Sequence, residues 1–327
     1  MTTEGADPLR IGQELDRAVV TVDPALPRLV HEGVERTAGR PLGTGEGPRV
    51  HVGPAVPGLG DGERLLWVHS TTAGVDALLK AHTPWPREVL LTRTVGRMGE
   101  RIGQYVLAWA LAELQDVPGF LRQQVSRTWN RLETELADGT LAVVFGTGRI
   151  GSGIAAALQQ CGVRTVGVAR SPRQAPGFDG VVPLGAPAGA DSPGIPSAEL
   201  AGVLGEARWV VNALPLTAET AGLFGAELFA AMDGPTFFNV GRGETVRTEA
   251  LARALEAGRV GRAVLDVLPE EPAPATSPAW DLPRTTLTSH SAGPTTHADV
   301  TADFRAAWEA LRAGEFPALT VRVTAGY

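Results

Sequence analysis

The stretch Leu141–Gly151, LAVVFGTGRIG, joins an apolar run to three spaced glycines, Gly146, Gly148 and Gly151. The apolar half predicts a buried strand and residues 152–160 predict a helix, so the glycines occupy the turn between them. In such a turn Gly146 permits the tight bend, Gly148 lets a pyrophosphate approach the backbone, and Gly151 lets the helix lie close to the strand. The helix N-terminus presents N–H groups to an anion. A plain glycine turn is the alternative, but the context favours a dinucleotide-binding unit.

The composition of the chain is that of a globular protein. Its 327 residues, 43% hydrophobic and 20% charged, suffice for two domains with ordinary cores. The net charge of −7 argues against nucleic-acid binding, and no apolar run or leader indicates a membrane span or secretion. Cys161 is the only cysteine, which excludes an intrachain disulfide and a cysteine-based structural metal site. We expect a cytoplasmic protein without a metal, a nucleic acid or a membrane as partner.

Strand and helix patterns alternate along the chain, which predicts the α/β class. In the first part, strands are expected at 17–23, 49–52, 65–69 and 89–92, with a helix at 27–37 between the first two. After a long helix around residues 102–109, further strands are expected at 142–145, 165–168, 209–213, 236–239, 262–266 and 286–288. A last helix over 296–313 precedes a tail that we expect to return to the first domain. The Pro/Gly/Ala-rich stretch 183–197 reads as a surface loop without chemistry.

We therefore expect two Rossmann-like, doubly wound parallel-sheet domains, with a dinucleotide-binding domain inserted into a substrate domain. The expected bounds are 1–95 with 294–327 for a flavodoxin-like, substrate-binding domain and 96–293 for the dinucleotide-binding Rossmann domain.

The end of the strand 165–168 indicates which dinucleotide is bound. An acidic residue there would accept a hydrogen bond from the adenosine 2′-OH of NAD. The chain instead reads Ala169-Arg170-Ser171-Pro172-Arg173. Guanidinium groups suit a phosphate dianion, so we expect Arg170, Ser171 and Arg173 to bind the 2′-phosphate of NADP. NADP is the preferred cofactor in this interpretation and NAD remains possible; the alternative is a solvated basic turn.

Three ionisable residues, Arg242, Glu271 and His290, each follow a predicted strand. Ligands bind at the carboxyl ends of strands in open α/β sheets. An arginine can hold a carboxylate and polarise a neighbouring carbonyl, and a histidine can protonate the forming alkoxide. A carboxylate beside the histidine holds the ring and favours its charged form. Singly, each residue could be an ordinary surface or loop side chain; together, after a dinucleotide loop, they indicate reduction of a ketone next to a carboxylate.

The chain resembles the D-isomer-specific 2-hydroxyacid dehydrogenase family, and within it the glyoxylate/hydroxypyruvate reductase branch. The resemblance covers Leu66 to the C-terminus and rests on Gly146-x-Gly148-x-x-Gly151, Leu214-Pro215-Leu216-Thr217-x-x-Thr220, Asn239-x-x-Arg242-Gly243, Asp266-Val267-x-x-x-Glu271-Pro272 and Ser289-His290-x-Ala292-Gly293. It implies that Arg242, Glu271 and His290 are catalytic and that Asp266 contacts the nicotinamide carboxamide. It implies further cofactor contacts from Gly146, Gly148, Arg149, Ile150, Gly151, Leu214, Pro215, Thr220, Val240, Gly241 and Gly293.

In the first domain, residues 70–76, STTAGVD, resemble a family loop whose backbone N–H groups bind the substrate carboxylate. The resemblance implies that Thr72, Ala73 and Gly74 bind substrate together with Arg242 and His290. Two threonines replace apolar or glycine residues usual in this loop, which concerns the identity of the substrate. The family also implies a homodimer joined through the cofactor domain.

The resulting interpretation is an enzyme that reversibly reduces a small 2-ketoacid, of the glyoxylate or hydroxypyruvate type, to a D-2-hydroxyacid with NAD(P)H. Three alternatives stay open. The same fold could act on phosphite or a phosphorylated hydroxyacid, or on a larger ketoacid of specialised metabolism. It could also serve as a non-catalytic dinucleotide sensor.

Overall fold

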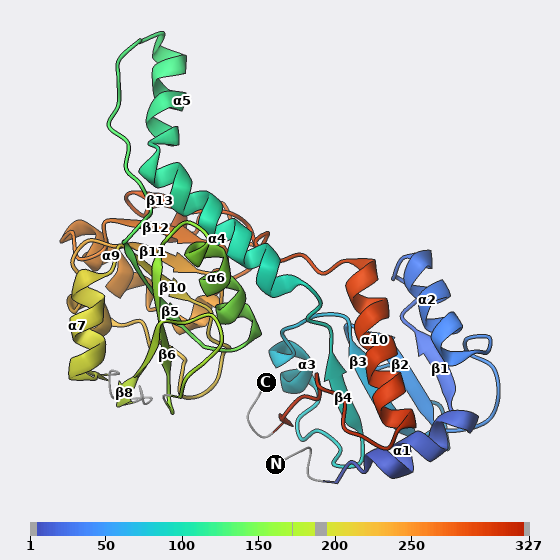
Figure 1. Ribbon diagram of the computed structural model, residues 1–327. Helices are drawn as coiled ribbons and strands as arrows, with labels where there is room; N and C mark the ends of the chain where they lie inside the picture. Colours follow the sequence, from blue (N-terminus) through green and yellow to red (C-terminus); the bar gives the residue numbers. More distant parts are fainter. Residues whose placement is uncertain (1–4, 172, 187–194, 324–327) are drawn as a thin grey trace. The chain divides into compact units, whose positions relative to one another are not determined.

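Two compact units make up the chain, of which the computed structural model describes residues 5–171, 173–186 and 195–323. One unit combines Met1–Arg97 with Thr295–Tyr327, and the other is Met98–Pro294 (Figure 1). The main sheet of each unit is parallel and is covered by helices, so the α/β fold class with one such domain inserted into another is confirmed. Among the helices described, none is long and apolar enough to cross a membrane.

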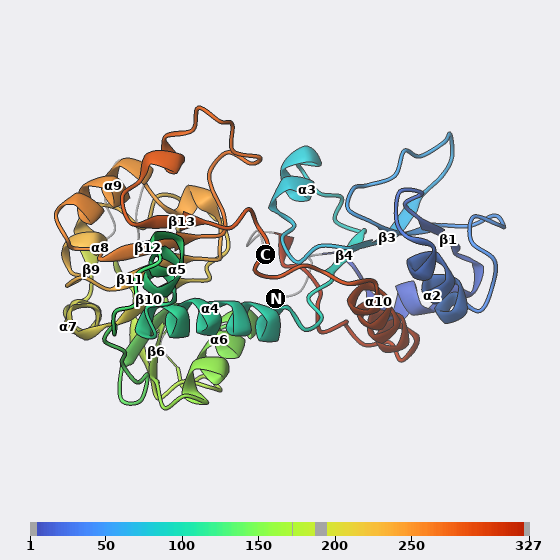
Figure 2. The ribbon, with the colours of Figure 1, turned by 90° about the horizontal axis from the view of Figure 1, so that it is seen from above.

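The first unit is built on a parallel sheet in the order β1-β2-β3-β4. These strands are β1 (Val19–Val22), β2 (Arg49–Gly53), β3 (Leu65–Ser70) and β4 (Leu90–Arg93). Figure 2 shows α2 (Arg28–Ala38) and α10 (His297–Arg312) on one face of this sheet and α3 (Asp76–Ala81) on the other. Helix α1 (Pro8–Glu14) and the short 3-10 helix η1 (Leu15–Arg17) precede β1. The tail does return to this unit, because Val321 N donates to the Leu91 carbonyl over 2.9 Å.

The core of the first unit explains why these helices form. Apolar residues one turn apart face the sheet, Val30 and Val34 on α2 and Phe304 and Trp308 on α10, and all four are buried. The ring of Phe304 stacks on that of Trp67 in β3, with centroids 5.0 Å apart.

The strand order of the first unit requires a correction to the expected flavodoxin-like topology. A flavodoxin-like sheet reverses its order after the first strand, 2-1-3-4-5, whereas the four described strands follow one another in chain order. The reason lies in residues 39–48, GRPLGTGEGP, between α2 and β2. Four glycines and two prolines in ten residues form turns, because glycine weakens a strand and proline cannot donate to a sheet.

The second unit has a seven-stranded parallel sheet in the order β13-β12-β11-β10-β5-β6-β7. The strands are β5 (Leu141–Phe145), β6 (Arg164–Ala169), β7 (Gly180–Pro183), β10 (Trp209–Asn212), β11 (Thr236–Asn239), β12 (Arg262–Leu265) and β13 (Thr285–Leu287). The chain starts this sheet in its middle, at β5, builds outward through β6 and β7, and then returns to β10. The order therefore reverses beside β5, and a dinucleotide crevice is expected at this switch point.

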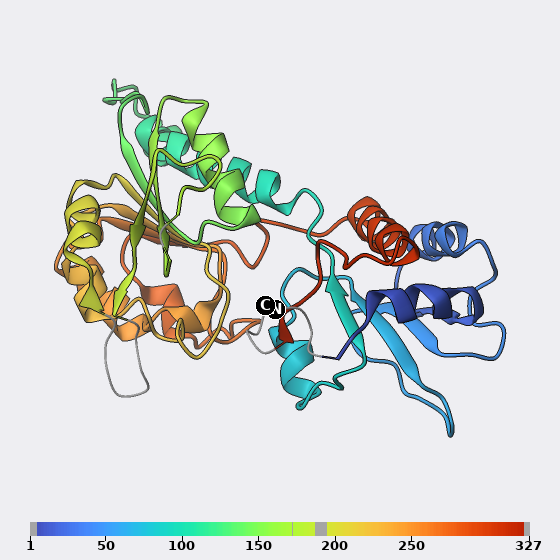
Figure 3. The same ribbon diagram turned by 60° about the horizontal axis from the view of Figure 1, so that its bottom comes forward.

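Helices cover both faces of the seven-stranded sheet. Figures 1 and 3 show α4 (Met98–Leu114) and α6 (Arg149–Gln159) on one face, and α7 (Ala198–Glu206), α8 (Ala226–Ala230) and α9 (Thr248–Glu256) on the other. Smaller elements are the antiparallel pair β8 (Gly185–Ala186) and β9 (Ile195–Pro196) and the 3-10 helices η2 (Gly243–Thr245) and η3 (Pro278–Asp281). Of the stretch 183–197, expected to be a surface loop, residues 187–194 lie outside the described part of the chain.

Helix α5 (Val117–Ser126) and the returning segment to Leu136 project away from the sheet of their unit (Figure 1). We call residues 117–136 the arm. Its apolar side chains are exposed: Val125 is 87%, Trp129 99% and Leu136 82% accessible. Sequence patterns did not predict α5, since its apolar residues line no core of the described chain.

Candidate functional site

The glycine turn after β5 has the shape expected of a pyrophosphate cradle. Gly146 has φ +101°, and a Cβ on Gly151 would lie 1.8 Å from the Gly146 carbonyl oxygen, so α6 can approach β5 only with glycine at 151. A Cβ on Gly148 would meet no atom within 4 Å. Gly148 is the N-cap of α6 and, without a side chain, accepts no hydrogen bond from the first N–H groups of that helix. Open space beside uncapped helical N–H groups fits a dinucleotide pyrophosphate, and Arg149 and Ile150 form the first turn of α6 at this point.

Arg170, Ser171 and Arg173 follow β6, as the sequence predicted. The Arg170 guanidinium forms an ion pair with the Glu219 carboxylate, and the two side chains are 59% and 50% exposed. Ser171 and Arg173 are also exposed. Positive charge thus stands at the carboxyl end of β6, the position where a ribose 2′-substituent would be recognised.

The loop after β10 is held in one shape by side-chain hydrogen bonds. Thr220 Oγ1 donates to the Pro215 carbonyl over 2.6 Å and accepts from Thr217 N over 2.8 Å. Leu214 N donates to Asn212 Oδ1 over 3.1 Å. This turn places Leu214, Pro215 and Thr220 beside the switch point.

Buried asparagines connect this loop to the segment that carries Arg242. Asn212 Nδ2 donates to Asn239 Oδ1 over 2.8 Å, and Gly241 N donates to the same oxygen over 3.2 Å. Val240 N donates to the Asn212 carbonyl over 3.0 Å. The Arg242 side chain turns back so that Nη1 donates to the Gly241 carbonyl over 2.7 Å.

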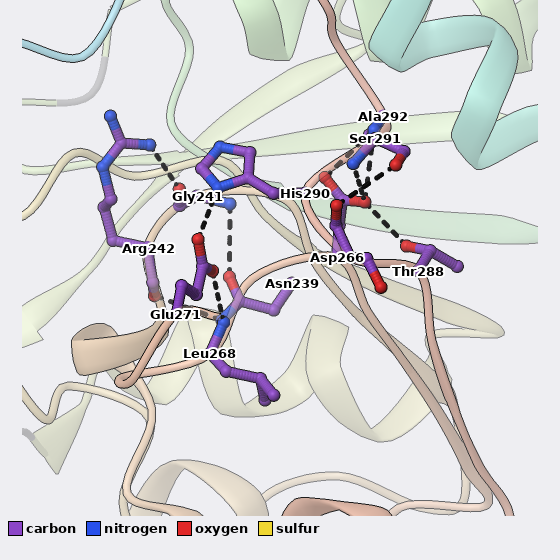
Figure 4. Close-up of polar contacts among 11 residues, drawn as sticks. Asn239, Gly241, Arg242, Asp266, Leu268, Glu271, Thr288, His290, Ser291 and Ala292 are labelled. Atoms are coloured by element: carbon purple, nitrogen blue, oxygen red, sulfur yellow. Dashed lines mark hydrogen bonds and ion pairs between the residues drawn. The ribbon is translucent and has the colours of Figure 1, made fainter. Parts of the chain in front are cut away.

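His290 and Glu271 are in direct contact (Figure 4). His290 Nδ1 lies 2.7 Å from Glu271 Oε2, and Leu268 N donates to Glu271 Oε1 over 2.8 Å. The backbone N–H therefore fixes the carboxylate, and the carboxylate fixes the imidazole ring. Glu271 engages Nδ1, so a ligand of this histidine would be met by Nε2. Figure 4 places the Arg242 side chain next to this pair, so the structure brings together the three residues singled out by the sequence.

Asp266 shapes the loop from which His290 projects. Its Oδ1 accepts from Thr288 Oγ1 at 2.6 Å and Ser291 N at 2.8 Å, and Ala292 N lies 3.1 Å from both carboxylate oxygens. His290 N also donates to the Asp266 carbonyl over 2.6 Å. The loop needs such support because Ser289 and His290 have φ of 55° and 54°, a region costly for residues with a side chain. Asp266, only 4% exposed, thus positions the histidine.

Sequence reasoning assigned no role to Tyr105 and Thr288. The hydroxyl of Tyr105 lies 2.7 Å from Thr288 Oγ1, and because Thr288 donates its proton to Asp266, Tyr105 must be the donor. Burial raises the pKa of Tyr105, so the hydroxyl keeps its proton. The only signal for Thr288 in the sequence was a polar residue two positions before His290. Gly293, which the family resemblance implied as a cofactor contact, lies just beyond the loop that carries His290.

The loop with Thr72, Ala73 and Gly74 belongs to the first unit, where it follows β3. Thr72 Oγ1 donates to the Gly74 carbonyl over 2.8 Å and lies 3.1 Å from Ser70 Oγ. Arg93 Nη1 donates to the Ala73 carbonyl over 3.1 Å. The two hydroxyls and the guanidinium thus hold the loop closed on itself.

Comparison with known proteins identifies the family. Residues 107–292 match the model of the "D-isomer specific 2-hydroxyacid dehydrogenase, NAD binding domain". The chain is 32% identical over 270 residues to glyoxylate/hydroxypyruvate reductase A of Serratia proteamaculans, covering 81% of this chain and 82% of that protein. It is 52% identical over 289 residues to an uncharacterized protein in the mprR 3′ region of Streptomyces coelicolor, covering 87% and 98%.

A solved structure agrees with this assignment. The D-isomer specific 2-hydroxyacid dehydrogenase of Xanthobacter autotrophicus Py2, crystallised with NADPH and MES, aligns with a TM-score of 0.77 and 26% identity over 94% of this chain and 99% of that one. The glycine cradle, the His290–Glu271 pair beside Arg242 and these similarities lead to one conclusion: the chain belongs to the D-isomer specific 2-hydroxyacid dehydrogenase family.

Proposed function

We propose that the protein uses NADPH to reduce a small 2-ketoacid to the D-2-hydroxyacid, and catalyses the reverse reaction with NADP, with glyoxylate and hydroxypyruvate as the first substrates to test. The observation that carries the proposal is the 2.7 Å contact of His290 Nδ1 with Glu271 Oε2, beside Arg242 and in the same unit as the glycine cradle. The similarity to a glyoxylate/hydroxypyruvate reductase A and to a dehydrogenase crystallised with NADPH supports it.

In this proposal His290 holds the proton that is transferred. Nε2 donates it to the ketone oxygen as an alkoxide forms, and Glu271 stabilises the charged ring through Nδ1. The nicotinamide, when bound, supplies the hydride. The Arg242 guanidinium binds the substrate carboxylate and polarises the ketone. In the first unit, we assign to Thr72, Ala73 and Gly74 a share in binding the carboxylate.

The geometry of the second unit supports the proposed cofactor contacts. The N–H groups at the start of α6 receive the pyrophosphate above Gly148, where no side chain intrudes. Arg170, with Ser171 and Arg173, binds the 2′-phosphate, and this gives NADPH the preference over NADH.

The decisive experiment follows NADPH and NADH oxidation with a panel of 2-ketoacids, with phosphite and NADP as a separate arm. We expect turnover with NADPH preferred. His290→Ala should lower kcat by about 10²–10⁴ while NADPH binding stays within about twofold. Tight NADPH binding without turnover of any ketoacid would overturn the enzymatic proposal in favour of a sensor. Full activity of the His290 variant would refute the assigned acid.

We also propose a homodimer joined through the cofactor unit, with the arm in the interface. The arm exposes the large apolar side chains of Val125, Trp129 and Leu136, and exposed apolar side chains on one projecting segment favour a contact with another protein chain. Sedimentation of the wild type should give the mass of two chains, and the double variant Val125→Glu/Trp129→Glu should give that of one. The control Leu29→Glu, at a position 63% exposed on α2, should stay dimeric. A wild type that is monomeric at micromolar concentration contradicts the proposal.

A further inference from the structure

The ion pair between Arg170 and Glu219 lies across the switch point of the second unit. Arg170 follows β6, Glu219 lies in the loop after β10, and β5 is the strand between these two in the sheet (Figure 1). The glycine turn of β5 therefore has one partner of the pair on each side. A dinucleotide whose pyrophosphate lies over that turn extends its adenosine ribose toward the end of β6, which is where Arg170 is engaged.

The loop holds Glu219 in place for this contact. Thr220 N donates to the Thr217 carbonyl over 3.1 Å, and the hydroxyls of Thr217 and Thr220 lie 3.1 Å apart. Glu219 stands inside this tight turn, so its backbone has little freedom. The carboxylate is presented to Arg170 by a preformed turn, although the residues are 49 positions apart in the chain.

We propose that Glu219 limits the preference for NADPH by competing with the 2′-phosphate for Arg170. The inference rests on the proposed NADPH specificity and names the residue that limits it. A 2′-phosphate must displace the carboxylate from the guanidinium and then stays close to a like charge. NADH carries a 2′-hydroxyl, which neither needs the guanidinium nor is repelled, and it can donate a hydrogen bond to the carboxylate. Glu219 thus lowers the affinity for NADPH and leaves that for NADH nearly unchanged.

The size of the effect is limited by the exposure of the pair. With side chains 59% and 50% accessible, water and salt screen the charges. Loss of an exposed competing pair and of one like charge near the phosphate should together tighten NADPH binding by about 3- to 10-fold at low ionic strength. The gain should shrink at high salt.

The test measures binding to the adenosine half alone, by titration calorimetry of the full chain with 2′,5′-ADP and with 5′-AMP. Glu219→Gln removes the charge and keeps the shape. We expect it to tighten 2′,5′-ADP by about 3- to 10-fold and to change 5′-AMP by less than about twofold. Glu256→Gln, at the exposed end of α9, removes the same charge elsewhere on the unit and should change neither.

A double-mutant cycle separates the inference from the cofactor proposal on which it rests. In an Arg170→Gln background, Glu219→Gln should tighten 2′,5′-ADP by less than about twofold, because the competition is gone and only the screened repulsion between like charges remains. Unchanged or weaker 2′,5′-ADP binding by Glu219→Gln, equal tightening of 5′-AMP, or a gain as large without Arg170 as with it would each overturn the inference. If Arg170→Gln weakens both nucleotides alike, the NADPH assignment itself fails.

Discussion

Replacing His69 with glutamine should remove a large part of the acid sensitivity of the first unit. His69 is 0% exposed in β3, and burial lowers the pKa of its ring to about 3. Its hydrogen bonds require one neutral tautomer. Thr92 Oγ1 accepts from Trp67 Nε1 over 2.8 Å and lies 2.7 Å from His69 Nδ1.

The other ring nitrogen continues the series of hydrogen bonds toward the end of β3. Thr94 Oγ1 donates to the Ser70 carbonyl over 3.0 Å, so His69 Nε2–H, at 3.1 Å, is the donor to Thr94. A neutral ring then carries no proton on Nδ1, so this nitrogen accepts from the Thr92 hydroxyl. A second proton on His69 would leave the Thr92 hydroxyl without its acceptor. It would also place a charge in a site lined by the rings of Trp67 and Phe304. The network is therefore stable only with a neutral ring.

The direction and the size of the effect of pH on stability follow from proton linkage. In the unfolded chain the pKa of His69 has its ordinary value of about 6.5, whereas in the folded chain it is about 3. Between these values the unfolded state binds one more proton, so stability is complete above pH 6.5 and falls by about 1.4 kcal/mol per pH unit as the pH is lowered. Burial also lowers the pKa of His51, which adds to the slope in the same direction.

The assay is urea unfolding from pH 4.5 to 7.5, with pulsed hydrogen exchange and mass spectrometry following the peptide that contains β3. His69→Gln should be less stable at pH 7.5, yet its stability should depend on pH less steeply, by about 1.4 kcal/mol per unit below pH 6. Leu29→Gln, exposed on α2, changes no titrating group and should keep the wild-type slope. Parallel curves for wild type and His69→Gln, or nitrogen NMR showing a doubly protonated His69 at pH 5, would refute the reasoning.

Three further predictions concern the second unit. Gly148→Ala should fold normally but bind NADPH at least about 10-fold more weakly, whereas Gly151→Ala should lose about 1–3 kcal/mol of stability, because its Cβ would lie 1.8 Å from a carbonyl oxygen. Thermal unfolding measures the stability of both variants and titration measures their NADPH affinity. Equal losses of stability would contradict the prediction. Glu271→Gln should lower kcat about 10- to 100-fold with NADPH affinity unchanged, whereas Glu270→Gln, exposed in the same turn, should stay active. Steady-state kinetics compare the two variants, and equal kcat values for them would contradict the prediction. Asp266→Asn should lower the unfolding free energy by about 1.5–3 kcal/mol in urea titrations, because the amide nitrogen cannot accept the bonds made to the buried carboxylate; wild-type stability would contradict this.

The predicted strands before Arg242, Glu271 and His290 were found as β11, β12 and β13, since buried parallel strands read as short apolar runs bounded by turns. Strand β7 and helix α5 are among the elements that the sequence patterns did not predict. Strand β7 is a four-residue edge strand with a glycine and a proline at its ends, and helix α5 turns its apolar residues to solvent. In both cases the local pattern that identifies an element was weak, because the element packs little against a core.

The sequence by itself determined which chemistry is present and in what order it follows the glycine turn. These signals are local properties of the chain, and their meaning follows from side-chain chemistry. They are the spacing of the glycines, the basic residues after β6, and an arginine, a glutamate and a histidine after later strands. Only the tertiary structure decided which of these groups meet. The parallel sheet gathers the ends of its strands at one edge, so His290 reaches Glu271 and Arg170 reaches Glu219. The four contacts of Asp266 that hold the histidine loop could not be read from the chain, because their partners are mostly backbone N–H groups that every residue carries and only folding selects.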